Sequence, residues 1–176
     1  AILVNGEVVK DSSYQVDPEV DEVYYMGQFV DYFENIYIMM NKPKGYLSAT
    51  EDKDPTVIEL LDDFYKVLDL SIAGRLDKDT TGLLLLSTDG KFIHRVTSPN
   101  SNIEKTYIAK TRDPIDESLI DIFKEGVYIK EDDYTARSAK LEILGDNEAK
   151  VTVTEGKFHL VKRLFSNSGN EVVELK

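Results

Sequence analysis

The sequence predicts an α+β protein built on a mixed, mostly antiparallel sheet with flanking helices. Asn5-Gly6, set between two short apolar runs, is typical of a tight hairpin between antiparallel strands. Residues 150–154 alternate between polar and apolar side chains, as in a strand with one buried face. After Asp113-Pro114, apolar side chains recur at helical spacing up to Gly126.

Residues 1–30 form the first predicted domain, and residues 31–35 are its linker to the rest of the chain. Strands are expected at 2–4, 8–9 and 23–26, with turns between them. About thirty residues of this kind bury little core of their own.

The main domain is predicted to cover residues 36–176. In its first half, the apolar runs 36–40 and 83–86 indicate strands buried on both faces, and a short helix fits 56–61. Asp89-Gly90 opens a helix that stops before Pro99. In the second half, a helix capped by Asp113 ends at Gly126, and further elements follow: strands at 127–129, 139–143, 150–154 and 172–175, and a helix at 158–165.

Composition excludes several classes of protein. The absence of cysteine rules out thiol catalysis, disulfides and cysteine-based zinc sites, and it favours the cytoplasm. No apolar run approaches the roughly 20 residues of a membrane span. The first residues lack signal-peptide features. They also lack an initiator Met, so the chain is expected to begin within a domain, as a fragment of a longer protein.

A net charge of −12 argues against nucleic acid as a partner, but the charge is unevenly spread. Residues 1–70 carry 15 acidic and 5 basic side chains, and residues 111–176 carry 14 and 10. Residues 71–110 carry 4 and 6, which leaves the centre of the chain slightly positive. The local field governs binding more than the total does.

The segment most informative about chemistry is a polar loop that runs into the apolar residues 83–86. Asp77 lies in this loop between Gly74 and Gly82, whose backbones can turn sharply or admit a ligand closely. A carboxylate anchored beside a rigid strand suits nucleophilic or acid–base work. A structural turn, in which Asp77 or Asp79 caps the backbone, explains the same pattern.

Gly74-Arg75-Leu76-Asp77, followed by residues 79–86 and Asp89-Gly90, resembles the catalytic motif of the RsuA/RluB-type ribosomal RNA pseudouridine synthases. Further segments resemble other motifs of that family in the same order: 41–45, 98–99 with 105–107, 126–127 with 135–136, and 155–165 with 169–170. Residues 1–30 resemble the strand half of an S4 RNA-binding domain, although an unrelated β-appendage is the alternative.

The resemblance implies that uridine in RNA is isomerised to pseudouridine, with Asp77 as the nucleophile. It implies that Tyr107 stacks on the flipped uracil, unless it is an ordinary core tyrosine. A cation must keep the carboxylate ionised. Lys162 and Arg163 are the candidates, and motif position favours Lys162.

The expected RNA contacts surround this catalytic group. Arg75 would contact phosphate or fill the vacated stack, or else pair with Asp77 or Asp79 on the surface. The remaining contacts would border an RNA groove, unless they are solvated charges: Lys42, Lys44, Lys105, Lys157 and His159. No metal or small-molecule cofactor is expected.

The segment from His159 to Phe165 resembles the small-subunit branch, so 16S ribosomal RNA is the expected substrate. The expected partner is ribosomal RNA or an assembling ribosomal subunit, and the enzyme is expected to be a monomer. The family usually has Gln and Met where this chain has Leu160 and Leu164. Three alternatives stay open: a synthase for 23S large-subunit RNA, a non-catalytic RNA-binding or ribosome-assembly factor, and a protein-binding domain that acts through acidic surfaces.

Overall fold

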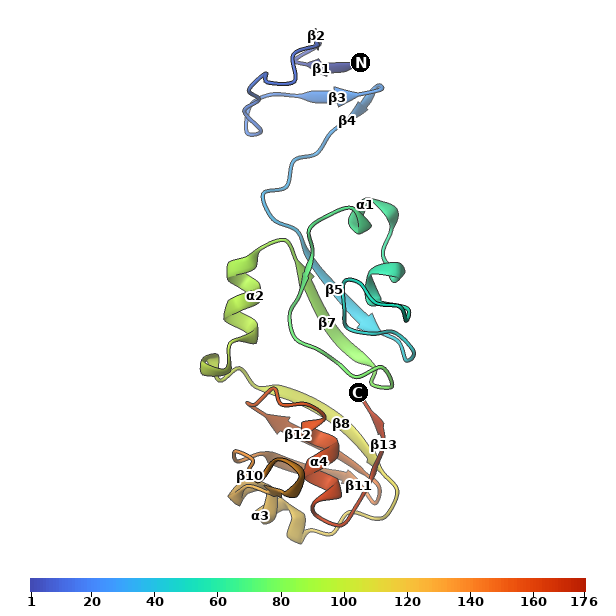
Figure 1. Ribbon diagram of the computed structural model, residues 1–176, viewed down its shortest axis with the longest axis vertical. Coiled ribbons are helices and arrows are strands. Elements are labelled where there is room, and N and C mark those ends of the chain that lie inside the picture. The colour runs from blue at the N-terminus through green and yellow to red at the C-terminus, as the bar shows by residue number, and fades with distance from the viewer. The chain divides into compact units, whose positions relative to one another are not determined.

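The computed structural model describes residues 1–176, which separate into two compact units, Ala1–Ile36 and Tyr37–Lys176 (Figure 1). The division falls one residue beyond the linker predicted at 31–35. The α-helices of the structure are all too short to span a membrane. Both units are built on antiparallel strand pairs, and the second adds short helices, so the predicted α+β class is confirmed.

The first unit is a four-stranded antiparallel sheet in the order β2-β1-β3-β4. Its strands are β1 (Ile2–Val4), β2 (Glu7–Val9), β3 (Val23–Tyr25) and β4 (Gln28–Phe29). Asn5 and Gly6 have φ values of 50° and 82°, which confirms the predicted hairpin. Met26 and Gly27 repeat this geometry with φ of 51° and 80° and join β3 to β4, a hairpin that was not predicted.

The second unit contains two main sheets and a small ribbon. One sheet has the order β5-β7-β6, with β5 (Tyr37–Lys42), β6 (Ser71–Ile72) and β7 (Gly82–Ser87). The other has the order β11-β12-β8-β13, with β8 (Lys105–Thr111), β11 (Lys140–Gly145), β12 (Glu148–Val153) and β13 (Val172–Leu175). The ribbon pairs β9 (Tyr128–Ile129) with β10 (Tyr134–Thr135).

Four α-helices and three 3₁₀ turns complete the second unit. The helices are α1 (Asp63–Lys66), α2 (Gly90–Thr97), α3 (Ser118–Glu125) and α4 (Leu160–Ser166). The 3₁₀ turns are η1 (Val57–Leu60), η2 (Pro99–Ser101) and η3 (Lys130–Asp132). α2 opens at Asp89-Gly90 as predicted, and the Asp89 carboxylate caps it by accepting from the N–H groups of Lys91 and Phe92.

The helix expected directly after Asp113 begins later, at Ser118. The N–H of Ile115 donates to the carbonyl of Asp146 at 2.7 Å, which ties this stretch to the β11–β12 connection instead of a helix. The Asp113 carboxylate accepts from the Arg112 guanidinium and is not a cap. Gly126 ends α3 as predicted.

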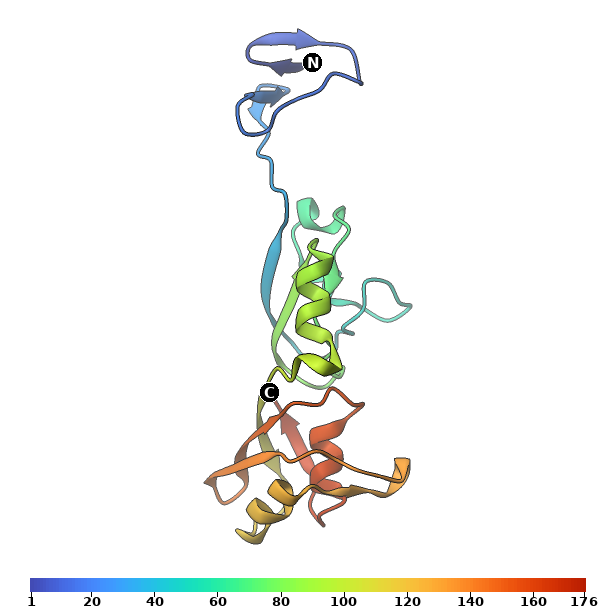
Figure 2. The same ribbon diagram turned by 90° about the vertical axis from the view of Figure 1, so that its left-hand side faces the viewer.

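The prediction that residues 36–40 and 83–86 are buried on both faces is wrong. Successive residues of a strand point to opposite faces, and α2 lies along one face of the β5–β7 pair (Figure 2). Leu84 and Leu86 are buried there with Val57, and Met40 packs against them. Met39 points the other way and is 78% exposed.

The larger core lies between the β11-β12-β8-β13 sheet and the helices α3 and α4. Phe123 and Phe165 meet edge to face, with ring centroids 5.1 Å apart. Leu160 and Leu164, the two departures from the family motif, are both buried in this core. Their apolar packing fixes α4, the helix that carries Lys162.

Candidate active site

The loop from residue 73 to residue 81, which joins β6 to β7, is held by neighbouring segments. The Ser48 hydroxyl donates to the Leu76 carbonyl at 2.9 Å and accepts from the Leu76 N–H at 3.0 Å. The Thr81 N–H donates to the carbonyl of Leu175, the last residue of β13. These bonds hold the loop on both sides of Asp77.

Lys42 supports the same loop from inside the protein. The prediction that Lys42 borders the RNA groove is therefore wrong. Its side chain is 0% exposed. The ammonium donates to the carbonyls of Thr80 at 2.9 Å, Pro43 at 3.0 Å and Lys78 at 3.4 Å. Burial lowers the pKa of Lys42, although the charges of Asp79 and Asp77 oppose that shift.

Asp77 meets two basic side chains of the segment that leads into and forms α4. Lys162 Nζ lies 3.1 Å from Asp77 Oδ2, and His159 Nε2 lies 3.2 Å from Asp77 Oδ1. Each carboxylate oxygen therefore faces its own nitrogen. His159 stands at the start of α4 with φ of 50°, a left-handed conformation that aims its ring at the loop.

Lys162 also contacts Asp79, which binds it with both oxygens at 2.7 and 2.9 Å. Burial alone would lower the pKa of Lys162, but its hydrogen bonds to Asp79 and Asp77 outweigh that effect and raise it. The hydrogen bond from Lys162 in turn lowers the pKa of Asp79. The lysine is therefore cationic at neutral pH.

Tyr107, on β8, packs partly buried against the larger core. Its pKa is raised, first by burial and then by the negative charge of Asp77. The phenol is therefore neutral at physiological pH and lies within the electrostatic reach of the carboxylate. A neutral phenol can both donate and accept a hydrogen bond.

Arg163 does not contact Asp77. Its Nη2 lies 2.8 Å from Asp132 Oδ2, and its Nη1 donates to the Phe158 carbonyl at 3.3 Å. The structure thus brings Lys162, and not Arg163, to the carboxylate. Arg163 instead connects α4 to the turn η3.

The other predicted RNA contacts lie at or near the surface. Arg75 is exposed and forms no ion pair with Asp77 or Asp79, which removes the surface pairing considered for it. Lys44 is exposed and shares a small recess with Asp79 and Lys162. The ammonium of Lys157 lies 3.5 Å from the centroid of the Tyr134 ring. Lys105 is partly buried and donates to the Ile103 carbonyl.

A family model described as RNA pseudouridylate synthase matches residues 36–167, which include Asp77, Tyr107, His159 and Lys162. The chain belongs to this family. Its activity is therefore that of an RNA pseudouridine synthase, an isomerase, as the sequence predicts.

Curated relatives align with nearly the whole chain. "Ribosomal small subunit pseudouridine synthase A" of Haemophilus influenzae is 41% identical over 99% of this chain and 75% of its own length. The protein of the same name from Escherichia coli strain K12 is 38% identical with the same coverage. "Uncharacterized RNA pseudouridine synthase YtzG" of Bacillus subtilis is 45% identical over 100% of this chain and 75% of its own length.

Solved structures share the fold. A crystal structure of a pseudouridylate synthase superposes with a TM-score of 0.76 at 41% identity, covering 99% of this chain and 75% of that one. Human RNA pseudouridylate synthase domain containing 1 superposes with a TM-score of 0.58 at 18% identity, covering 82% and 66%. At that identity the second likeness shows the fold alone.

Sequence reasoning did not single out two groups that shape the synthase site. The sequence indicates Asp79 only as a turn cap or a surface partner of Arg75, yet Asp79 binds Lys162 with both oxygens. Its place two residues after Asp77 was the available signal. No sequence pattern identifies Ser48, which binds the backbone of Leu76, because the two residues lie far apart in the sequence.

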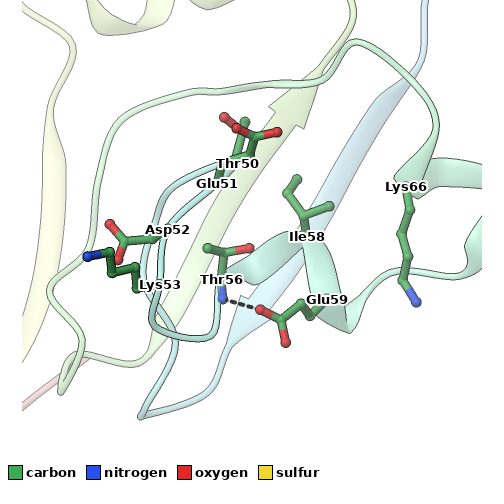
Figure 3. Close-up of a pocket in the computed structure, with 8 residues that line it drawn as sticks. All are labelled: Thr50, Glu51, Asp52, Lys53, Thr56, Ile58, Glu59 and Lys66. Carbon is green, nitrogen blue, oxygen red and sulfur yellow. Dashed lines mark hydrogen bonds between the residues drawn. The ribbon is translucent and has the colours of Figure 1, made fainter.

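An open hollow of the synthase unit is lined by eight residues between positions 50 and 66, none of which belongs to α4 (Figure 3). In the lining of the hollow, the Glu59 carboxylate accepts a hydrogen bond from the Thr56 N–H at 2.9 Å (Figure 3). That bond forms half of a capping box at the start of η1. None of Asp77, Tyr107, His159 and Lys162 lines this hollow, so it is separate from the candidate active site.

Proposed function

We propose that this enzyme converts a uridine of small-subunit (16S) ribosomal RNA to pseudouridine, with Asp77 as its nucleophile. Two relatives whose names specify the small ribosomal subunit, at 41% and 38% identity over 99% of the chain, support the choice of RNA. The observation that carries the chemical role is the placement of Lys162 and His159 on the two oxygens of Asp77.

The isomerisation breaks the N1–C1′ bond, turns the uracil and joins its C5 to C1′, after which the proton on C5 is lost. Asp77 begins the reaction as an ionised carboxylate. Lys162 Nζ, 3.1 Å from Asp77 Oδ2, places a positive charge directly against the carboxylate and holds it in position. We assign this supporting role to Lys162 alone, because Arg163 pairs with Asp132.

Uridine within stacked RNA must leave its stack to reach a carboxylate held against a sheet. Tyr107 supplies the aromatic surface against which the flipped uracil rests, and its neutral phenol suits that apolar contact. Arg75 contacts phosphate or occupies the vacated stack. Lys44, Lys105 and Lys157 border the RNA path around this centre.

The first unit contributes to RNA binding in this proposal, as the strand part of an S4-like domain at residues 1–30. The enzyme acts as a monomer in the cytoplasm on free RNA or on an assembling ribosomal subunit. It needs neither a metal ion nor an organic cofactor, because the reaction is an isomerisation without net transfer or redox change.

Tritium release from 16S and 23S RNA labelled at uridine C5 tests the proposal directly. The parent chain should release tritium from 16S RNA, and Asp77→Asn, which keeps the size of the side chain, should not. Glu59→Gln is the matched control, because it alters a carboxylate in the hollow of Figure 3 and should leave turnover unchanged. Release from 23S RNA alone would overturn the choice of substrate, and an active Asp77→Asn would overturn the mechanism.

A further inference from the structure

Phe158 presents an aromatic ring to solvent next to the active site. Its side chain is 69% exposed. The ring stacks on that of His159, with centroids 3.6 Å apart and planes 20° from parallel. His159 contacts Asp77, so the exposed ring is separated from the nucleophile by a single imidazole.

The position of Phe158 is fixed although its ring is exposed. Its carbonyl accepts a hydrogen bond from Arg163 Nη1, and Arg163 is anchored to Asp132. The chain turns through the left-handed φ of His159 directly after it and then enters the core at Leu160. One face of the ring rests on His159, which leaves the other face for a flat partner.

The chemistry of the surroundings indicates a nucleobase as that partner. Aromatic side chains bind unstacked bases through their faces with little preference for sequence. When the target uridine flips out, its neighbouring bases lose the base on which they stacked. A flanking base can then stack on an aromatic side chain instead. Lys157, the preceding residue, adds a positive charge that suits the phosphate of such a nucleotide.

We propose that Phe158, backed by His159, stacks against the base of a nucleotide that flanks the flipped uridine. This inference rests on the proposed function, because it assumes that the target uridine lies at Asp77. It assigns Phe158 a binding role and no chemical one. The substrate class it specifies is RNA whose target uridine has an unpaired neighbour.

Binding can be measured without turnover in the Asp77→Asn background, with a short single-stranded RNA that carries one uridine flanked by 2-aminopurine. Stacking quenches 2-aminopurine fluorescence. Phe158→Leu keeps an apolar side chain but removes the aromatic face, whereas Phe158→Tyr retains it. Phe64→Leu is the matched control, since Phe64 is also exposed and aromatic but lies on α1.

The Asp77→Asn protein and its Phe158→Tyr form should bind the RNA and quench the probe. Phe158→Leu should weaken binding about tenfold and lose the quenching, while Phe64→Leu should change neither. With the active aspartate restored, Phe158→Leu should raise KM for 16S RNA and leave kcat nearly unchanged.

Unchanged affinity and quenching in Phe158→Leu would overturn the stacking role, and so would equal losses in the Leu and Tyr variants. Binding without quenching in the Asp77→Asn protein, or no binding of the probe, would overturn it as well. Tritium release by the parent chain is measured separately, so failure of the proposed function is distinguishable from failure of the stacking role. Circular dichroism establishes that each variant is folded.

Discussion

Lys162 Nζ lies 2.7 Å from Oδ1 of Asp79, closer than its 3.1 Å distance from the proposed nucleophile. The lysine is therefore shared between two carboxylates, one of them largely exposed and the other partly buried. In the partly buried pair with Asp77, the charge of Lys162 acts in a lower dielectric, and its interaction is stronger than in the exposed pair with Asp79. Asp79 holds the ammonium in place from the solvent side.

Lys162→Met should lower kcat for tritium release by about 100-fold, the scale seen when one oriented charge is removed from an active site. Methionine keeps most of the volume but removes the positive charge that lies 3.1 Å from Asp77 Oδ2. Lys66→Met, which breaks the exposed pair with Asp63, should leave kcat unchanged. Equal activity in the two variants would remove Lys162 from the mechanism.

Asp79→Asn should move the alkaline limb of the kcat profile to lower pH. The pKa of Lys162 is raised above 10.5 because hydrogen bonds to Asp79 and Asp77 outweigh burial. Removing one carboxylate lowers that pKa, so the ammonium is lost at a lower pH. For folding, a raised lysine pKa means that the stabilisation is present below 10.5 and is lost as pH rises through the folded-state pKa.

The comparison for Asp79→Asn is the parent chain, measured over the same pH range with brief incubations that limit alkaline cleavage of RNA. Stability near neutral pH should fall by no more than about 0.5 kcal/mol, because the Asp79 side chain is largely exposed. An alkaline limb that stays in place would show that Lys162 titration does not limit turnover.

The sequence predicted elements well where a local side chain decides the structure. Asn5-Gly6 sets a hairpin through its own backbone preference, and Asp89 caps α2 through two neighbouring N–H groups. Asp113 is also an aspartate, here followed by a proline, but it caps no helix. The carbonyl of Asp146, more than thirty residues away, accepts a hydrogen bond from the Ile115 N–H and holds this stretch outside a helix. Distant contacts of that kind have no local pattern.

The same division between local patterns and distant contacts applies to the active site. Asp77 could be found because it lies in a continuous motif, and Lys162 because its motif is also continuous. The burial of Lys42 could not be read from its neighbours, since an Asn-Lys-Pro-Lys-Gly segment looks like an exposed basic turn. Its partners are backbone carbonyls, and carbonyls carry no sequence signature.

Lys42→Met should destabilise the protein by about 2 kcal/mol, because buried carbonyls of the Asp77 loop lose their donor. The loosened loop should also lower kcat, with little change in affinity for RNA. Urea unfolding and steady-state tritium release measure the two effects. Intact stability together with weaker RNA binding would restore Lys42 to the RNA groove.

Lys44→Met is the matched comparison, since Lys44 is exposed two residues further along the chain. Loss of one phosphate contact should raise KM about threefold, reduce the salt dependence of binding by about one unit of slope and leave stability unchanged. A purely structural Lys44 would leave KM and its salt dependence as in the parent chain.

Gly126→Ala should destabilise the second unit by about 2 kcal/mol or more. Gly126 has φ of 102°, and a Cβ there would lie 2.5 Å from the carbonyl oxygen of Ala136, which is backbone and cannot swing aside. Gly145→Ala is the control, because a Cβ at that position meets nothing within 4 Å. Equal unfolding midpoints in urea would contradict this account.

His159→Ala should lower kcat at saturating RNA by about tenfold, whereas His159→Gln should keep much of the activity. His159 Nε2 faces Asp77 Oδ1 at 3.2 Å, and the amide of glutamine can place a donor at a similar distance from the backbone. If His159 acts by orienting the Asp77 carboxylate, the hydrogen-bond donor of glutamine should restore kcat although it carries no positive charge. If it only binds phosphate, both variants should raise KM equally and leave kcat alone. Parallel measurement of kcat and KM across a salt series separates the two roles, because phosphate contacts weaken with salt and the orientation of Asp77 does not.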